Sequence, residues 1–416
     1  MKNNLVLFFA TLLCSTISYA QRIIGSWHGK LDFGGQEIAL SFKFSIDGNK
    51  VPSGKMNIPQ QGVKDMPVNI SLLTPDSVSL QLPAIGMSYS GKLEQDKIKG
   101  AFKQNGITLP LDLEQGNVDK PNRPQEPTPP YSYKTEEVSF TNAKANAVFS
   151  GTLTLPIGYT PDKSVPVVLM VSGSGPQDRD ENIYGHKLFL VIADYLAKNG
   201  IATLRYDDRG VGKSTGSSVG CTSEDFAGDA DSGLQWIKNN GNYRFSKVGI
   251  LGHSEGGSIA FMLASENKVD FVVSMAGPGI KGDTLLAEQQ NAILKNYGRV
   301  ANRTVKSVRD ELKLQPKDSW MDYFINYDPA TTIANKKIPV MAINGSNDMQ
   351  VISSSTLNAI RELLKTKNKK NFFKEYAGLN HLFQHCQLSN SLDYYNIDET
   401  CSEEVLKDIA GWINGL

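Results

Sequence analysis

Residues 248–257 read VGILGHSEGG, an apolar run typical of a buried strand followed by glycines gathered around one serine. A strand that simply ended would need one turn residue, whereas Gly252, Gly256 and Gly257 together indicate backbone that comes too close for side chains. Residues 252–256 fit Gly-x-Ser-x-Gly, the pattern that holds a nucleophilic Ser254 on a sharp turn between a strand and a helix. Five-residue matches also arise by chance, and a tight turn with an incidental serine is the alternative.

The histidines restrict where a base for this serine can come from. A serine hydroxyl is a poor nucleophile without a base, and the base needs an acid to orient it. In chains that carry such a turn, the acid and then the histidine follow the serine. Of the five histidines, His28 and His186 precede the serine, and His253 adjoins it on a turn that sends neighbouring side chains different ways. His381 follows the last predicted strand and is the predicted base, whereas His385, one helical turn later, is expected to support structure.

The acid is predicted from the end of another strand. The run IPVMAING at 338–345 is followed by Ser-Asn-Asp, which places Asp348 at the carboxyl end of that strand. An aspartate after a strand is also a common helix cap. The loop after the preceding strand, residues 276–279, holds no carboxylate that could serve instead. Ser254, Asp348 and His381 are therefore the predicted catalytic residues.

Strands and helices alternate from residue 136 to residue 416. The predicted strands are 147–155, 165–172, 201–206, 247–252, 270–275, 338–343 and 371–377. The predicted helices are about 187–198, 223–239, 254–265, 353–366 and 402–414, the last behind a Thr400-x-x-Glu403 capping box. This alternation predicts an α/β domain with a doubly wound, mostly parallel sheet. A mixed helical stretch of about 280–333 interrupts it, as a cap insertion over one edge of the sheet.

The chain before residue 136 follows other patterns. Residues 1–20 form a short apolar run behind a lysine and end in SYA, which predicts a cleaved signal peptide and a periplasmic or extracellular protein. Residues 21–118 alternate with period two between turn signals, which predicts a small antiparallel β-barrel or sandwich. The proline-rich stretch 119–135 predicts a stiff linker, so a chain that begins near Tyr131 is expected to fold by itself.

Residues 136–416 resemble an α/β-hydrolase and are similar to bacterial secreted carboxylesterases. Residues 21–118 resemble the lipocalin-like β-domain that some of these enzymes carry at the N-terminus. The stretch 171–178, VSGSGPQD, follows a predicted strand where this family places half of its oxyanion hole. The resemblance implies backbone N–H donors at Ser174 and Glu255.

The glycines on either side of Ser174 belong to the same implied oxyanion hole. Gly173 and Gly175 would let the backbone approach the substrate oxygen, and Gly175 is counted with the oxyanion residues. Ser172 occupies the place where many relatives have a histidine.

Other classes of function are disfavoured. Lys plus Arg equals Asp plus Glu at 43 each, so no bulk charge favours nucleic acid. The GKS at 212–214 matches the end of a P-loop, but Asp207 stands where that motif needs glycine, and Asp207 and Asp208 would repel phosphates. We expect this loop to be structural, with Asp207 and Arg209 pairing with neighbours. We expect no metal, no cofactor and no membrane span.

Three cysteines remain once the signal peptide is removed, namely Cys221, Cys386 and Cys401. Export to an oxidising compartment permits pairing. Cys386 and Cys401 lie close in sequence, so they form either a disulfide or two small buried thiols.

The predicted activity is that of a secreted serine carboxylesterase acting on small to medium acyl esters, including acyl groups on carbohydrates. A serine peptidase or aminopeptidase of the same fold is the alternative enzyme, and a catalytically silent surface-binding module is the alternative outside enzymes. The cap insertion is expected to set acyl preference, and its aromatic and aliphatic side chains either line an acyl pocket or pack the insertion onto the sheet. Those side chains are Leu285, Tyr297, Trp320, Tyr323 and Phe324.

Overall fold

A computed structural model describes residues 23–32, 37–118, 121–334, 337–364, 368–387 and 391–416. The chain divides into two compact units, residues 1–120 and residues 121–416. The predicted signal peptide, residues 1–20, lies outside the described residues. Within the described ranges, none of the helices has the length and apolar character that crossing a bilayer requires.

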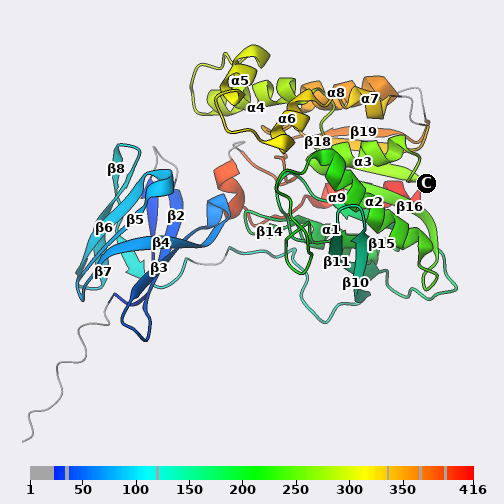
Figure 1. Cartoon of the computed structure of the whole chain (residues 1–416). Coiled ribbons are helices and arrows are strands. Elements are labelled where there is room, and N and C mark those ends of the chain that lie inside the picture. The colour runs from blue at the N-terminus through cyan, green and yellow to red at the C-terminus, as the bar shows by residue number, and fades with distance from the viewer. Residues whose placement is uncertain (1–22, 33–36, 119–120, 335–336, 365–367, 388–390) are drawn as a thin grey trace, which may run out of the picture. The chain divides into compact units, whose positions relative to one another are not determined.

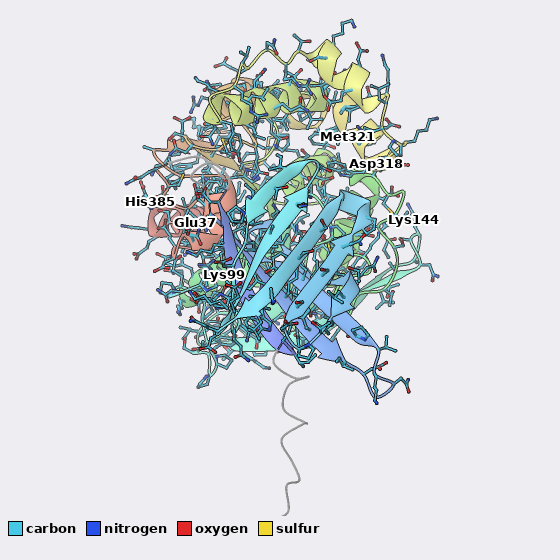
Figure 2. The ribbon with its side chains drawn as sticks, turned by 90° about the vertical axis from the view of Figure 1, so that its left-hand side faces the viewer. Glu37, Lys99, Lys144, Asp318, Met321 and His385 are labelled. Carbon is cyan, nitrogen blue, oxygen red and sulfur yellow. The ribbon has the colours of Figure 1, made fainter. Side chains whose placement is uncertain are left out.

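The first unit is an antiparallel β-barrel, in agreement with the prediction from period-two alternation. Its strands follow the order β6-β5-β4-β3-β2-β1-β9-β7-β8, and an additional pairing of β6 with β7 closes the sheet. The described strands are β1 (Gly25–Asp32), β2 (Glu37–Ile46), β3 (Pro52–Ile58), β4 (Val63–Leu73), β5 (Ser77–Leu82), β6 (Met87–Glu94), β7 (Lys97–Gln104), β8 (Ile107–Pro110) and β9 (Leu113–Gln115). Figure 2 shows these strands side by side, with Lys99 on β7.

The barrel interior is filled by large side chains on alternate positions. Phe42 and Phe44 on β2 are buried, and Phe42 stacks on Tyr89 of β6 with ring centroids 5.5 Å apart. Asn105 and Gly106 join β7 to β8 with φ values of 50° and 85°. Two consecutive residues with positive φ form the tight hairpin turn that the Asn-Gly pair predicts.

The second unit is built on an eight-stranded sheet of order β10-β11-β15-β12-β16-β17-β18-β19. The first two pairings, β10 with β11 and β11 with β15, are antiparallel, and all later pairings are parallel. The strands are β10 (Lys134–Asn142), β11 (Ala147–Leu155), β12 (Val165–Val171), β15 (Ala202–Tyr206), β16 (Phe245–His253), β17 (Phe271–Met275), β18 (Val340–Gly345) and β19 (Phe372–Tyr376). Only β10, at the edge, has no counterpart among the predicted strands.

Helices cover both faces of this sheet, as the doubly wound pattern predicts. The helices α2 (Ser223–Asn239), α3 (Glu255–Ser265) and α8 (Ser353–Leu364) bury their apolar residues in one core cluster. The helices α1 (Leu188–Lys198) and α9 (Glu403–Asn414) bury theirs in a second cluster on the other face. The central strands are therefore buried on both sides, which explains why they read as continuous apolar runs.

The predicted cap insertion lies between β17 and β18. It contains α4 (Gly282–Asn296), α5 (Val305–Leu312), α6 (Ser319–Asn326) and α7 (Ala330–Ile333). Figure 1 shows α4 beside α8, and the Ser355 hydroxyl of α8 donates to the Glu288 carboxylate of α4 at 2.5 Å. In Figure 2, Asp318 and Met321 lie together at the start of α6.

The predicted capping box before the last helix is wrong. Ser402 precedes α9 and makes no side-chain capping bond. The Thr400 hydroxyl lies 3.1 Å from Nδ1 of the buried His186 instead. The Thr400 hydroxyl therefore contacts His186, which is distant in the sequence, instead of capping the helix that follows it. A capping box is present elsewhere, at Thr222 and Asp225 before α2.

The proline-rich stretch packs onto the second unit from residue 121 onward. The Arg123 guanidinium donates to the carbonyl oxygens of Gly185, Tyr395 and Ile397 at 2.7 to 2.9 Å. The Gln125 side chain donates to the Cys401 carbonyl oxygen at 2.7 Å and accepts from the Cys401 N–H at 3.0 Å. Residues 121–125 thus tie themselves to segments more than sixty residues away.

Candidate active site

Ser254 stands alone between β16 and α3 in a strained conformation. Its φ of 53° and ψ of −121° lie outside the regions that ordinary residues adopt. The Ser254 N–H donates to the Met275 carbonyl oxygen of β17 at 2.9 Å, and the Ser254 carbonyl oxygen accepts from the Gly257 N–H at 2.9 Å. Such strain persists only where the surroundings over-determine it, and it projects the serine from the end of the strand.

The glycines around Ser254 are required by close backbone approach. A Cβ on Gly252 would lie 2.0 Å from the Gly256 carbonyl oxygen, and a Cβ on Gly256 would lie 2.1 Å from the Val171 carbonyl oxygen. A Cβ on Gly257 would lie 2.7 Å from the Gly277 Cα. Each contact is with backbone, which cannot move aside cheaply. The glycine pattern therefore reflects the packing of the turn against β12 and β17.

His381 and Asp348 are in contact, although they are far apart in the sequence. Nδ1 of His381 lies 2.7 Å from Oδ2 of Asp348, and both side chains are buried. The other carboxylate oxygen accepts from the backbone N–H groups of Gln350 and Val351 at 2.8 and 3.0 Å. The Asp348 carboxylate is thus fixed on both sides, and it fixes the imidazole through Nδ1.

The loops that carry these two side chains are held together at their backbones. The Asn347 N–H donates to the Leu379 carbonyl oxygen at 2.9 Å, and the Ser346 N–H donates to the Tyr376 carbonyl oxygen at 2.9 Å. A Cβ on Gly345 would lie 2.2 Å from the Leu379 carbonyl oxygen. Backbone hydrogen bonds therefore hold the loops after β18 and β19 together, and this places Asp348 next to His381.

Ser254 and His381 line one cavity of about 400 Å³. Nε2 of His381 and Oγ of Ser254 have no hydrogen-bond partner in the part of the chain that the structure describes. The cap insertion contributes Leu285, Trp320 and Phe324 to the cavity wall. The two other aromatic residues predicted for an acyl pocket, Tyr297 and Tyr323, are not in this wall.

Tyr297 and Tyr323 do not line the cavity at Ser254, and only Tyr323 packs the insertion onto the sheet. Tyr297 at the end of α4 is 49% exposed. Tyr323 stacks on Tyr327 with ring centroids 5.8 Å apart and packs against the core beneath the insertion. The insertion therefore both lines the cavity and packs onto the sheet.

The residues implied as oxyanion donors border the same cavity, with one exception. Ser174 and Glu255 line it, and the Ser174 N–H has no acceptor among the described residues. Glu255 is the first residue of α3, where a backbone N–H has no partner within the helix. Gly175, with φ of 87°, borders the neighbouring cavity instead. Gly173 lies nearest the serine, because a Cβ there would be 3.1 Å from the Ser254 Cβ.

A buried pair that the sequence reasoning passed over lies beside these groups. Nδ1 of His253 lies 2.9 Å from Oε1 of Glu181, and Nε2 of His253 lies 3.0 Å from the His381 carbonyl oxygen. Oε1 of Glu181 also accepts from the Gly173 N–H at 2.8 Å. On the sequence alone, His253 is excluded as the base because the turn sends the side chains of neighbouring residues different ways. The only sequence signal for its partner is a carboxylate in the loop after the strand that leads to Gly173.

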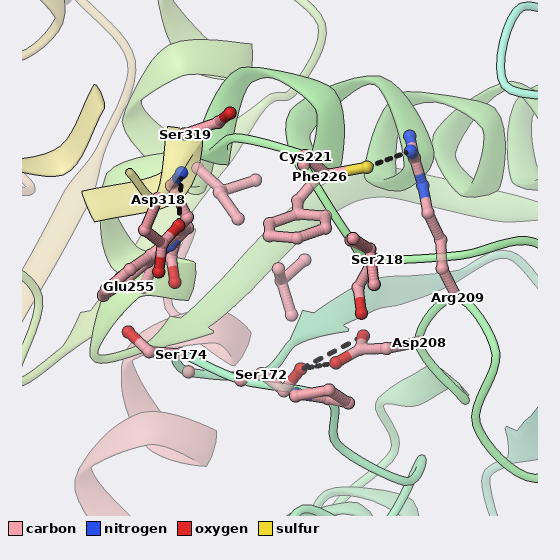
Figure 3. A pocket seen from close by; sticks show the side chains of 18 of the residues that line it. Ser172, Ser174, Asp208, Arg209, Ser218, Cys221, Phe226, Glu255, Asp318 and Ser319 are labelled. Atoms are coloured by element: carbon pink, nitrogen blue, oxygen red, sulfur yellow. Dashed lines mark hydrogen bonds between the residues drawn. The ribbon is translucent and has the colours of Figure 1, made fainter. Parts of the chain in front are cut away.

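A larger cavity of about 840 Å³ adjoins the first and shares Gly173, Ser174, Glu255 and Trp320 with it. Figure 3 shows Asp208 beside Ser172 in the wall of this cavity, and the Ser172 hydroxyl donates to the Asp208 carboxylate at 3.2 Å. Burial raises the pKa of Asp208 to about 7, against the opposing effect of its hydrogen bonds. This cavity therefore holds a buried carboxylate in a wall that also contains the apolar side chains of Phe226 and Ile259.

The loop with the P-loop-like ending is structural, as the sequence predicts. The Asp207 carboxylate pairs with Arg179 at 2.8 Å and accepts from the Lys213 N–H at 3.3 Å. Arg209 pairs with the buried Asp229. Asp207 lies so close to Gly212 that a Cβ there would be 2.4 Å from the carboxylate. The loop is thus filled by a carboxylate where a P-loop would hold phosphate.

Cys221, Cys386 and Cys401 are free thiols, so the disulfide alternative for Cys386 and Cys401 is not formed. Burial raises the pKa of Cys401 well above its ordinary value. Over the described ranges, no group of three or more histidine, cysteine or acidic side chains is arranged to hold a metal ion.

Two comparisons of the sequence with known proteins give matches to hydrolases. Residues 186–335 match the family model described as serine aminopeptidase, S33. The chain is 28% identical over 274 residues to Esterase EstD of Thermotoga maritima, which covers 63% of this chain. The chain spans 65% of the length of that curated relative.

Solved structures with a similar course of the chain include two hydrolases. An esterase of Pyrococcus furiosus has 18% identity and a TM-score of 0.46, and covers 71% of this chain and 99% of its own. A dienelactone hydrolase of Anabaena variabilis has 18% identity and a TM-score of 0.41, and covers 68% of this chain and 99% of its own. The chain has an α/β-hydrolase fold, with a serine on the turn between β16 and α3, and its residues 186–335 are similar to the serine aminopeptidase family model.

Proposed function

We propose that the protein is a serine carboxylesterase that hydrolyses small to medium acyl esters. The observation that carries the proposal is the arrangement of three groups from separate loops. Asp348 holds His381 through Nδ1 at 2.7 Å, while His381 and the strained Ser254 face one cavity. An esterase among the relatives adds support.

The proposed reaction follows from these positions. The Ser254 hydroxyl attacks the ester carbonyl carbon as Nε2 of His381 takes its proton. The backbone N–H groups of Ser174 and Glu255 stabilise the oxyanion of the tetrahedral intermediate. His381 then returns the proton to the leaving alcohol, and water repeats the sequence on the acyl-enzyme. Asp348 keeps Nδ1 protonated and stabilises the imidazolium that forms.

The two cavities support an acyl group of limited size. The cavity at the serine, about 400 Å³, has apolar walls from the cap insertion and glutamine side chains at Gln177, Gln289 and Gln350. A side-chain amide both donates and accepts hydrogen bonds, which suits the hydroxyl groups of a sugar. Acyl groups carried on carbohydrates are therefore included among the proposed substrates.

We also propose that the chain is exported. The support is the sequence of residues 1–20, an apolar run with a lysine before it and small residues at its end. Sequencing the N-terminus of the protein recovered from periplasm or medium tests this, and an intact Met1 on the recovered protein would contradict it.

The direct test of the reaction compares two chromogenic substrates. We expect turnover of p-nitrophenyl acetate and butyrate, and stoichiometric labelling of Ser254 by a fluorophosphonate. Turnover of an aminoacyl p-nitroanilide tests the alternative that the protein is a peptidase. The description of the family model favours this alternative. In a peptidase, Asp208 would bind the amino group of the substrate. Faster turnover of the anilide than of the esters would replace esterase by peptidase.

Replacing Trp320 by alanine should widen the acyl preference. The indole lines both cavities, and its Nε1 donates to Oε1 of Glu255 at 2.8 Å, so it forms part of the wall between them. Removing it should raise kcat/KM for p-nitrophenyl octanoate relative to the acetate by about tenfold, the order that one or two methylenes contribute in a pocket.

The control for this variant is Tyr297→Ala, which removes an exposed aromatic side chain of the same insertion. It should leave the octanoate-to-acetate ratio unchanged. An unchanged ratio in the Trp320 variant as well would show that the larger cavity does not receive the acyl chain.

A further inference from the structure

The environment of His253 determines the protonation of its ring. One ring nitrogen faces the Glu181 carboxylate at 2.9 Å, and the other faces the His381 carbonyl oxygen at 3.0 Å. When Glu181 is ionised, both partners are acceptors only, because a carboxylate and a carbonyl oxygen carry no proton. Neutral imidazole carries one N–H and would leave its other nitrogen lone pair against an acceptor. Two acceptors therefore require two N–H groups.

The carboxylate of Glu181 is just as constrained. Its side chain is completely buried, and Oε1 accepts from both His253 and the Gly173 N–H. Oε2 has no hydrogen-bond partner among the residues that the structure places. A buried carboxylate with one unpartnered oxygen is costly unless an opposite charge lies beside it. The imidazolium of His253 supplies that charge.

We propose that Glu181 and His253 form a buried carboxylate–imidazolium pair that positions the oxyanion loop against the histidine loop. Glu181 holds the loop of residues 173–175 through the Gly173 N–H, and His253 holds the loop of His381 through its carbonyl oxygen. Among the described residues, neither side chain is hydrogen-bonded to Oγ of Ser254 or to Nε2 of His381, so we assign both as positioning residues. The kinetic part of this inference rests on the proposed function, and the protonation part does not.

The electrostatic surroundings agree with this geometry. Burial would lower the pKa of His253, but Glu181, the His381 carbonyl oxygen and the nearby Asp348 outweigh it and raise the pKa above its ordinary value. His381 also packs against His253, with ring centroids 4.8 Å apart. The cation is therefore favoured by the charges of Glu181 and Asp348, and the imidazole of His381 lies beside it.

The protonation state is measured directly by NMR on the ¹⁵N-histidine-labelled protein at pH 7.5, where an ordinary imidazole is mostly neutral. We expect one histidine with both ring nitrogens in the protonated shift range and with ring protons that exchange slowly. Its signals should vanish in His253→Gln. A neutral tautomer for His253 at this pH would overturn the proposal.

Kinetics tests the positioning role with Glu181→Gln. Glutamine keeps an acceptor for the Gly173 N–H but removes the charge, so the imidazolium is lost while the shape is kept. We expect kcat for p-nitrophenyl acetate to fall on the order of 10²-fold, the effect of misplacing a reacting group by about 1 Å, with KM changed less than about threefold. Glu375→Gln, which makes the same change at an exposed carboxylate on β19, is the matched control and should behave as wild type.

The losses of kcat in the two variants should also be non-additive. Because the pair acts as a unit, His253→Gln together with Glu181→Gln should lower kcat no further than either change alone. A kcat of Glu181→Gln within about threefold of wild type would overturn the positioning role while Ser254-dependent hydrolysis still supports the proposed function. If Glu181→Gln does not fold, the NMR measurement on the wild-type protein decides. An absence of ester turnover in the wild type would reject the function and leave the protonation result standing.

Discussion

Replacing Ser254 by alanine is expected to abolish turnover of p-nitrophenyl acetate, with kcat falling on the order of 10⁶-fold. The serine oxygen is the only atom removed, and it makes no side-chain hydrogen bond in the part of the chain that the structure describes. The fold should therefore persist, with a circular dichroism spectrum like that of wild type. Steady-state assays at high enzyme concentration measure the residual rate.

The matched control is Ser265→Ala at the far end of α3. Its hydroxyl donates only to the Met262 carbonyl oxygen at 2.6 Å, a local helix contact away from the cavity. It should retain wild-type activity. If Ser254→Ala kept more than a few per cent of the rate, another residue would have to be the nucleophile.

Replacing Asp348 by asparagine should lower kcat on the order of 10⁴-fold. The backbone N–H groups of Gln350 and Val351 donate to Oδ1, so the asparagine carbonyl oxygen will occupy that position. The amide NH₂ then faces Nδ1 of His381 where the carboxylate oxygen stood at 2.7 Å. That donor stabilises the tautomer with the proton on Nε2, which cannot accept a proton from the serine. Pre-steady-state acylation rates should show the same loss as kcat.

Asp393→Asn tests the competing assignment of the acid. Asp393 lies on the short helix η3 (Ser391–Asn396) and is the next carboxylate to test as the acid. We expect that variant to change kcat less than about threefold. Equal losses in both variants would mean that neither carboxylate alone orients the imidazole.

The glycines and apolar runs made most of the second unit predictable. Each central strand is buried on both faces, so its composition is set by burial alone and reads clearly in the sequence. The edge strand β10 was not predicted, because residues such as Glu136 and Glu137 on it meet solvent. An edge strand needs few apolar residues and benefits from charge. Its signal therefore resembles that of a loop.

The pair of Glu181 and His253 could not be predicted from sequence spacing. Its members are 72 residues apart, and Glu181 sits in a loop between β12 and α1 with φ of 48°. Loops have no periodicity from which a facing side chain can be inferred. The contact between His381 and Asp348 was predictable in kind, since both follow parallel strands that end at one edge of the sheet. Its length of 2.7 Å depends on the backbone bonds between the two loops.

The hydrogen bonds of Arg123 and Gln125 determine at which residue the barrel can be replaced by another domain. A chimera that keeps everything from Pro121 onward retains the bonds to the Tyr395 and Cys401 carbonyl oxygens, whereas one spliced at Tyr131 discards them. The tolerated crossover point is therefore expected just before Pro121 rather than at the end of the prolines. Residues 121–130 should therefore be kept with the second unit when the barrel is exchanged for another domain.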